Sequence, residues 1–208
     1  MKKENQKIKN KIQLIIGLIL IISGLIIYLM PYIKTEQNKK IENSKIKEYI
    51  KRVNINNNKV EEQTSINNEV KTNKDINYFM ILEIPKINLK KGLYNINSKY
   101  NKVDYGIEVL KESEMPNKES SNLILASHSG NSRIAYFKHL NKLKIGDKVY
   151  IYYDGIKYEY KISNFYQKEK DRTISIDSSK YTRIILITCV DNEEQLIYTG
   201  ILNNKENY

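Results

Sequence analysis

Hydrophobic residues are spread unevenly along the chain, and their longest uninterrupted run lies near the N-terminus. Residues 12–33, IQLIIGLILIISGLIIYLMPYI, are 22 residues without a charged side chain. A helix of about 20 apolar residues, rising about 1.5 Å per residue, spans the roughly 30 Å hydrocarbon core of a bilayer. A buried core helix would rarely be apolar on every face over this length. The pattern therefore predicts a transmembrane helix over residues 12–33.

The flanks of this run predict how it inserts. Residues 1–11, MKKENQKIKNK, hold five lysines and one glutamate, and positively charged flanks stay on the cytoplasmic side. We therefore expect a single-pass membrane protein with a cytoplasmic basic tail and the rest of the chain outside the cell. A cleaved signal peptide has an apolar core of about 7–15 residues and a small-residue cleavage site. This run is longer and ends in Met30-Pro31-Tyr32, so we expect an uncleaved anchor.

Residues 34–77 are polar and rich in Lys, Glu and Asn. Four apolar residues recur three to four positions apart, and this spacing predicts a short amphipathic helix around residues 40–53. These four are Ile46, Tyr49, Ile50 and Val53. Few apolar residues follow, and we interpret residues 34–77 as a stalk or linker between the membrane and a folded domain.

From Tyr78 onward the apolar residues alternate with polar ones or form short clusters, which is typical of strands. The clearest element, KVYIYYDGIKYEYKI, joins two alternating runs through Asp154-Gly155, a dipeptide that favours a type I′ hairpin turn. A helical turn or two is predicted over residues 134–140. Further strands are predicted at 78–84, 87–95, 121–128, 182–188 and 195–202. Six to eight strands with little helix predict an all-β domain over residues 78–208, a closed or nearly closed barrel.

Charge and composition exclude several kinds of function. The net charge is +11, but no nucleic-acid-binding motif accompanies it, and we interpret the charge as a topology signal and an attraction to an anionic membrane or wall surface. One cysteine and two histidines exclude an intramolecular disulfide and argue against a structural zinc site. Nucleotide-binding glycine motifs and GxSxG are absent from the sequence. We therefore expect no nucleic-acid partner and no metal or organic cofactor.

Two apolar runs end in a reactive side chain: SNLILASH ends at His128, and RIILITC ends at Cys189. A thiolate is an effective nucleophile, and an imidazole exchanges protons near neutral pH. A single cysteine in a strand is more often a buried core residue, and a single loop histidine is usually solvated. Their placement at the ends of two separate strands, 61 positions apart, favours a catalytic pair. His139 lies within the predicted helical turn and is a weaker candidate.

The stretches LILASHSG and IILITC resemble the sortases, the membrane-anchored cysteine transpeptidases of Gram-positive cell surfaces. The family pattern is a strand ending in a catalytic His, about sixty residues, then T-L-x-T-C and a strand that opens with Arg. The N-terminal anchor, the stalk and LEIPKINL match the family layout, and the resemblance covers residues 78–204. Papain-like peptidases place the Cys before the His, so this order argues against them. The residues leave the class of sortase open.

The resemblance implies a function and a mechanism. Cys189 would attack a carbonyl of a C-terminal sorting signal, Leu-Pro-x-Thr-Gly or a variant, and form a thioacyl enzyme. His128 would protonate the leaving amine and then deprotonate the incoming one, which belongs to a cell-wall precursor or a pilin lysine. Two alternatives stay open: a pseudo-enzyme that binds sorting signals without turnover, and a cysteine hydrolase that releases surface proteins.

One residue of the family pattern is missing. The arginine of the strand after the Cys loop falls near residue 195, where this chain has Gln195. The amide group of Gln195 can donate hydrogen bonds to an oxyanion, so we expect it to take this role. Arg133 and Arg172, in loops, are the alternatives. Arg52 lies in the stalk, and Arg183 lies six residues before the cysteine on the same strand, roughly 20 Å away at about 3.3 Å per residue.

Overall fold

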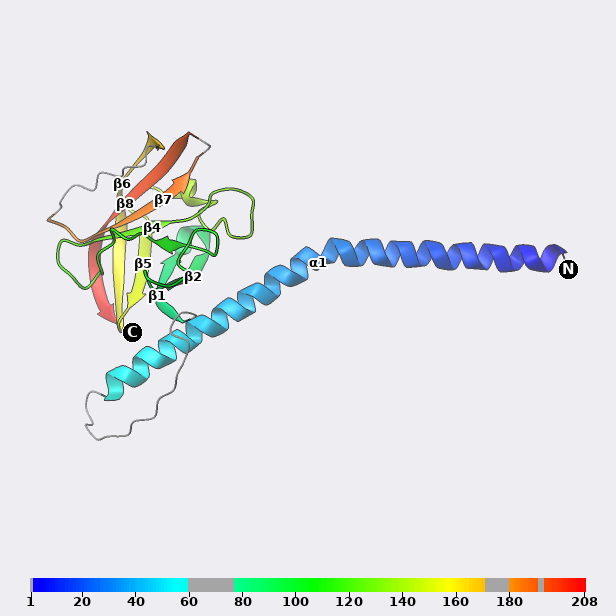
Figure 1. Ribbon diagram of the computed structural model, residues 1–208, viewed down its shortest axis with the longest axis horizontal. Coiled ribbons are helices and arrows are strands. Elements are labelled where there is room, and N and C mark those ends of the chain that lie inside the picture. The colour runs from blue at the N-terminus through cyan, green and yellow to red at the C-terminus, as the bar shows by residue number, and fades with distance from the viewer. Residues whose placement is uncertain (1, 60–76, 171–179, 191–192) are drawn as a thin grey trace. The chain divides into compact units, whose positions relative to one another are not determined.

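The computed structural model (Figure 1) describes residues 2–59, 77–170, 180–190 and 193–208. The chain divides into two compact units, residues 1–44 and residues 45–208. The first unit is helical. The second contains the end of the same helix and all the strands.

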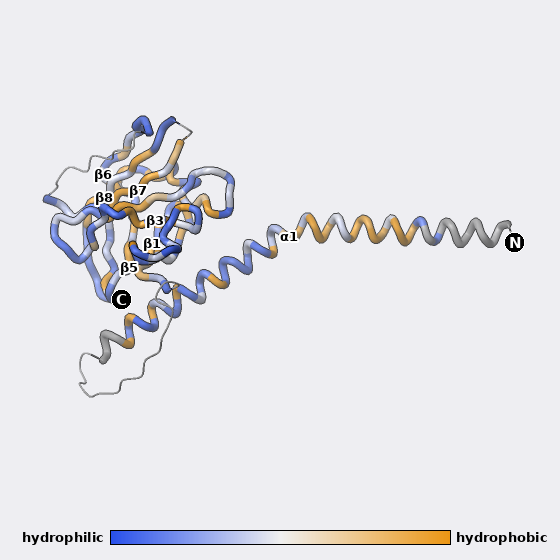
Figure 2. The backbone as a smooth tube through the Cα atoms, viewed as in Figure 1, coloured by the Kyte–Doolittle hydropathy of each residue, from blue (hydrophilic) through white to orange (hydrophobic). Residues whose placement is uncertain are grey.

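The helix α1, Lys2–Lys59, covers the predicted transmembrane run. Its part Gln13–Ile55 is long and apolar enough to cross a membrane by length and composition, with a window of mean hydropathy 2.7 that is not buried (Figure 2). We predicted a separate short helix around residues 40–53, whereas α1 runs through without a break. The intervening residues KTEQNK explain this difference, because Lys, Glu and Gln favour helix and no glycine interrupts them.

The end of α1 packs against the β domain through the four apolar residues that predicted an amphipathic helix. Ile46 and Tyr49 are each 4% exposed and cluster with Tyr78 and Ile81 of the first strand. The Tyr49 hydroxyl donates to the carbonyl oxygen of Tyr152 at 3.3 Å. This apolar contact explains why the compact unit begins at residue 45, ahead of the expected domain start at residue 78. Residues 60–76 of the predicted stalk lie outside the described part of the chain.

The described residues of the β domain form one eight-stranded sheet, in the order β2-β1-β5-β6-β8-β7-β4-β3. The strands are β1 Tyr78–Ile84, β2 Leu89–Tyr94, β3 Glu108–Val109, β4 Asn122–Ala126, β5 Lys148–Tyr153, β6 Ile156–Glu169, β7 Arg183–Cys189 and β8 Glu194–Asn207. All neighbours are antiparallel except β4 and β7, which are parallel. Cα atoms of the edge strands β2 and β3 approach within 8 Å, so the sheet is nearly closed. The predicted all-β barrel is confirmed.

Local signals in the sequence account for the clearest elements. Asp154 and Gly155, between β5 and β6, have φ angles of 52° and 76°, as the predicted type I′ turn requires. The predicted helical segment 134–140 is instead a series of turns that leads into the short 3₁₀ helix η2, Leu140–Lys142. A second 3₁₀ helix, η1, Pro85–Ile87, follows β1. The segment 134–140 still contributes Phe137 to the core, at 1% exposure.

Besides the cluster around the end of α1, the two faces of the sheet carry two further apolar clusters. The larger fills the barrel and includes Leu125 of β4, Leu186 of β7 and Tyr198 of β8. The residues that alternate with these point to the opposite face, because successive side chains of a strand point to opposite sides. There they form a smaller group, which we call the outer cluster. Its buried members are Ile124, Ile185, Ile187 and Ile197, with Leu110 and Ala126 packed against them.

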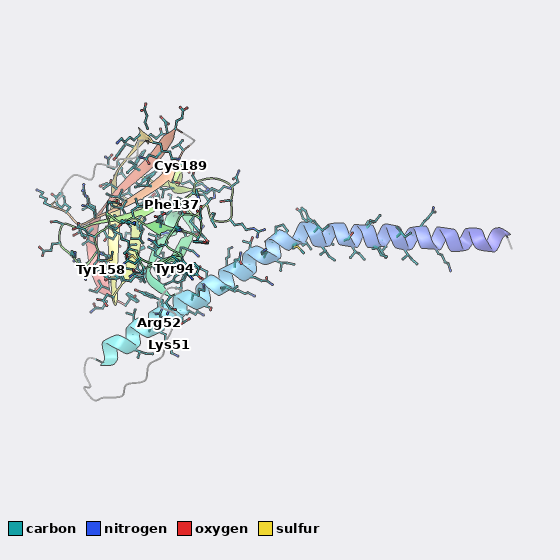
Figure 3. All side chains as sticks on the ribbon, viewed as in Figure 1. Lys51, Arg52, Tyr94, Phe137, Tyr158 and Cys189 are labelled. Carbon is teal, nitrogen blue, oxygen red and sulfur yellow. The ribbon has the colours of Figure 1, made fainter. Side chains whose placement is uncertain are left out.

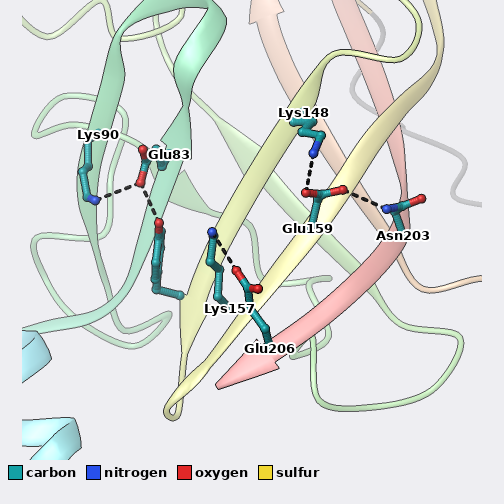
Figure 4. Close-up of polar contacts among 8 residues, drawn as sticks. Glu83, Lys90, Lys148, Lys157, Glu159, Asn203 and Glu206 are labelled. Carbon is teal, nitrogen blue, oxygen red and sulfur yellow. Dashed lines mark hydrogen bonds and ion pairs between the residues drawn. The ribbon is translucent and has the colours of Figure 1, made fainter. Parts of the chain in front are cut away.

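Polar contacts connect neighbouring strands at the barrel surface (Figure 4). Lys90 Nζ lies 2.8 Å from a carboxylate oxygen of Glu83, and the Tyr152 hydroxyl donates to the same oxygen at 2.8 Å. Burial raises the pKa of Glu83, but the hydrogen bonds from Lys90 and Tyr152 outweigh it and hold the pKa below its ordinary value of 4.5. Pairs at a surface contribute at most about 1 kcal/mol each, so the apolar core supplies most of the stability.

Candidate active site

Cys189 is the last residue of β7 and its free thiol is half-buried. The Val190 N–H donates to the Glu194 carbonyl at 2.9 Å, and this bond closes the connection from β7 to β8. Figure 3 shows Cys189 in the part of the domain where β6 and β8 reach their upper ends as drawn. Because Ile187 and Cys189 are two residues apart on one strand, the thiol is on the face of the outer cluster.

His128 follows β4 by two residues, and the pairing of β4 with β7 brings it level with Cys189. The parallel register joins Ala126 to Ile187. It continues past the end of β4, because the Ser127 N–H donates to the Ile187 carbonyl at 3.2 Å. Thr188, beside the cysteine, donates its hydroxyl to the Ser127 carbonyl at 2.8 Å in a buried bond. Two adjacent buried contacts thus hold the ends of the His and Cys strands together.

Gln195, the second residue of β8, is the direct antiparallel partner of Cys189. The neighbouring pair Val190–Glu194 is hydrogen-bonded, so Cys189–Gln195 is the adjacent non-hydrogen-bonded pair, whose side chains lie closer together. Gln195 is 7% exposed, and its Nε2 has no hydrogen-bond partner among the residues described. A buried donor without a partner costs about 1–3 kcal/mol. His128, Cys189 and Gln195 form what we call the active row, which runs from just beyond the end of β4 across β7 and β8.

The other residues considered from the sequence lie elsewhere. Arg183 is at the opposite end of β7, where its Nε donates to Asn122 Oδ1 at 2.8 Å. Arg133 is exposed in the loop after the histidine, and His139 is exposed at the N-cap of η2. Arg172 lies outside the described residues.

Asp104, which sequence reasoning missed, is the charged group beside the histidine. Its Oδ1 lies 3.6 Å from His128 Nε2, with the two side chains 75% and 41% exposed. The Ser127 hydroxyl donates to the Gly106 carbonyl at 3.0 Å and so ties the Asp104 loop to the strand that leads to the histidine. A single aspartate in a polar turn such as NKVDYG gives no signal in the sequence, because most such residues are simply solvated.

The arrangement suits covalent chemistry on a carbonyl. The thiol and the amide donor share one face at one end of the sheet, and the register of β4 with β7 brings the histidine level with them. A nucleophile, a proton carrier and an oxyanion donor therefore lie at the same end of the sheet, as chemistry on one bond requires. Among the residues described, no group of three or more His, Cys, Asp and Glu side chains is placed to hold a metal ion.

A family model of the sortase domain matches residues 82–202. Together with the nearly closed barrel, this match defines the class of protein: the chain belongs to the sortase family. The resemblance noted in the sequence is therefore confirmed.

Individual sortases are similar to this chain at low sequence identity. Sortase A of Bacillus anthracis is 27% identical over 124 residues, which is 58% of this chain and 58% of that relative. The crystal structure of Listeria monocytogenes sortase A matches with a TM-score of 0.55 at 22% identity, covering 63% of this chain and 90% of that one. Sortase C-3 of Streptococcus pneumoniae gives a TM-score of 0.58 at 18% identity, covering 81% and 88%. At these identities the structural likenesses show the fold alone.

Proposed function

We propose that this chain is a transpeptidase that cleaves a C-terminal sorting signal and joins the cleaved protein to an amine. The observation that carries the proposal is the active row, in which strand register brings His128 level with Cys189 and pairs Cys189 with Gln195, in a member of the sortase family. The sorting signal is Leu-Pro-x-Thr-Gly or a variant. The acceptor is a cell-wall precursor or a pilin lysine.

The reaction proceeds in two acyl transfers. The Cys189 thiolate adds to the carbonyl carbon of the scissile peptide bond, and the C–N bond then breaks as His128 gives a proton to the leaving amine. The thioacyl enzyme retains the N-terminal part of the substrate. The acceptor amine adds to the thioester, His128 takes its proton, and the C–S bond breaks to restore the thiolate.

The neighbours of the pair support these steps. The Gln195 amide donates to the oxygen that becomes negative when the thiolate adds, and one such donor is typically worth about 10²–10³ in rate. Asp104 contacts one ring nitrogen of His128, which leaves the other nitrogen to exchange protons with the substrate. Asp104 is a positioning residue, because it acts through the imidazole.

The same reading assigns the rest of the chain. Residues 1–11 form a cytoplasmic tail, residues 12–33 cross the membrane, residues 34–77 link the anchor to the enzyme, and residues 78–208 carry the reaction outside the cell. The hydropathy of residues 12–33 and the lysines before this run support this assignment.

The test is to incubate the full chain in detergent with sorting-signal peptides, with and without an amine acceptor, and to measure the intact mass. We expect a thioacyl adduct on Cys189 and a ligated product. Product formed only with water would indicate a cysteine hydrolase, and binding without an adduct or product would indicate the pseudo-enzyme.

Three variants test the catalytic roles of the cysteine and the histidine. Cys189→Ala should abolish transfer with the fold intact, and His128→Ala should lower the rate by roughly 10²–10⁴. His139→Ala is the matched control and should leave the rate unchanged. Transfer that survives in Cys189→Ala would exclude covalent catalysis through this thiol.

A further inference from the structure

The active row continues by one more strand. Lys168 of β6 is the direct antiparallel partner of Gln195, as Gln195 is of Cys189. Direct cross-strand partners present their side chains on the same face of a sheet. The lysine is therefore on the face of the thiol, two strands away.

The position of Lys168 differs from those of its neighbours on β6. Lys168 is half-buried, whereas Gln167 and Glu169 on either side of it are exposed. Neighbouring strands are about 4.8 Å apart, so the backbones of Lys168 and Cys189 are roughly 10 Å apart. The four-carbon stem of a lysine is long and flexible enough to bring its ammonium group over Gln195 toward the reacting carbonyl.

Other cations of the described chain are placed less favourably. Arg183 lies at the far end of β7. Arg133 and Lys170 are exposed in loops. Lys168 is the one cation within the row itself, among the residues described.

The chemistry of the row calls for a positive charge. Addition of a thiolate to a carbonyl moves a full negative charge onto the oxygen, and Gln195 offers only a neutral amide. Hydrogen bonds from charged donors are roughly twice as strong as those between neutral groups. Electrostatic stabilisation of an oxyanion is worth most in a site that is shielded from water.

We propose that Lys168 supplies the positive charge of the oxyanion site and that Gln195 supplies its oriented amide donor. This inference rests on the proposed transpeptidase function. The Lys168 ammonium donates a hydrogen bond to the oxyanion and stays protonated throughout, so the two acyl transfers balance without it. Lys168 is thus a catalytic residue contributed by a fourth strand.

The first experiment compares single variants of the full chain by the rate of thioacyl formation. Lys168→Gln should lower kcat roughly 10- to 100-fold with little change in KM, because the contact is made only in the transition state. Lys168→Arg keeps the charge and should retain most of the rate. Lys161→Gln is the matched control, since Lys161 is exposed on the same strand, seven residues away and opposite Ile201.

A double variant separates a catalytic role from a structural one. Gln195→Arg places a guanidinium beside the cysteine and should speed the reaction. In the Gln195→Arg background, Lys168→Gln should lower the rate of thioacyl formation less than threefold, because the charge is already supplied. If Lys168 only stabilised the fold, its replacement would lower the rate by the same factor in both backgrounds.

The outcomes distinguish this inference from the function on which it rests. An active wild type with an unaffected Lys168→Gln variant, or an equal loss in both backgrounds, would overturn the role of Lys168 alone. A wild type that forms neither adduct nor product would overturn the transpeptidase function and this role together. Thermal unfolding of every variant shows whether a lost rate reflects lost structure.

Discussion

Gln195→Met tests the active row by its effects on stability and on activity, which should have opposite signs. Gln195 is 7% exposed, and its Nε2 has no partner among the described residues. The penalty for such a donor is about 1–3 kcal/mol, and an apolar side chain of similar volume removes it. The same change removes the oxyanion donor, worth about 2.7–4 kcal/mol in the transition state.

We therefore expect Gln195→Met to be at least as stable as the wild type and about 10²–10³-fold slower. For a unit of this size, 1 kcal/mol corresponds to about 2–4 °C in Tm. The assay pairs thermal unfolding of the full chain in detergent with single-turnover thioacyl formation measured by intact mass. Gln167→Met is the matched control, because Gln167 is exposed on β6 beside the row, and it should change neither quantity.

One result would refute the reasoning: a Gln195→Met variant that loses more than about 1 kcal/mol of stability and keeps the wild-type rate. Gln195 would then be a structural residue whose amide is satisfied within the fold. If Gln195→Met loses both stability and rate, the slower rate could follow from lost structure alone. Gln195→Glu then tests the donor role, because a carboxylate of the same size repels the oxyanion.

Four further outcomes follow from the sequence and the fold. Protease added to intact protoplasts should digest residues 34–208, and full protection would contradict an extracellular catalytic domain. Asp104→Asn should slow transfer by no more than about fivefold, because an exposed pair is worth at most about 1 kcal/mol, and high salt should shrink the difference from wild type. Because the pKa of Glu83 is lowered in the fold, its carboxylate stabilises the protein above pH 4.5 and ceases to do so as the pH falls through the lowered pKa. In urea unfolding, Glu83→Gln should therefore be less stable than the wild type at neutral pH and as stable as the wild type in acid. An equal difference in the free energy of unfolding at both pH values would contradict this. Gly92→Ala should lower Tm, because a Cβ at Gly92 would collide with the Tyr78 ring, whereas Gly130→Ala, with nothing within 4 Å, should leave Tm unchanged.

Features encoded over a few neighbouring residues could be predicted from the sequence alone. The uncharged run predicted the apolar part of α1, and Asp154-Gly155 predicted the hairpin turn, because hydropathy and backbone preference act locally. The period-two pattern predicted most strands and the all-β barrel. The hydropathy pattern did not predict that α1 continues without a break, because helix-favouring polar residues resemble a flexible linker in composition.

Only the tertiary structure determines which residues come together in the candidate site. His128 and Cys189 could be singled out because each ends an apolar run, but only the parallel pairing of β4 with β7 brings them level. Three further features have no signal in the sequence: the buried Gln195 Nε2 without a partner among the described residues, the position of Lys168 beside it, and the contact of Asp104 with the histidine. The physical reason is that register between strands far apart in the chain is set by packing of the whole sheet. A strand's own side-chain pattern fixes which face a residue occupies, and the neighbours it meets on that face depend on the rest of the fold.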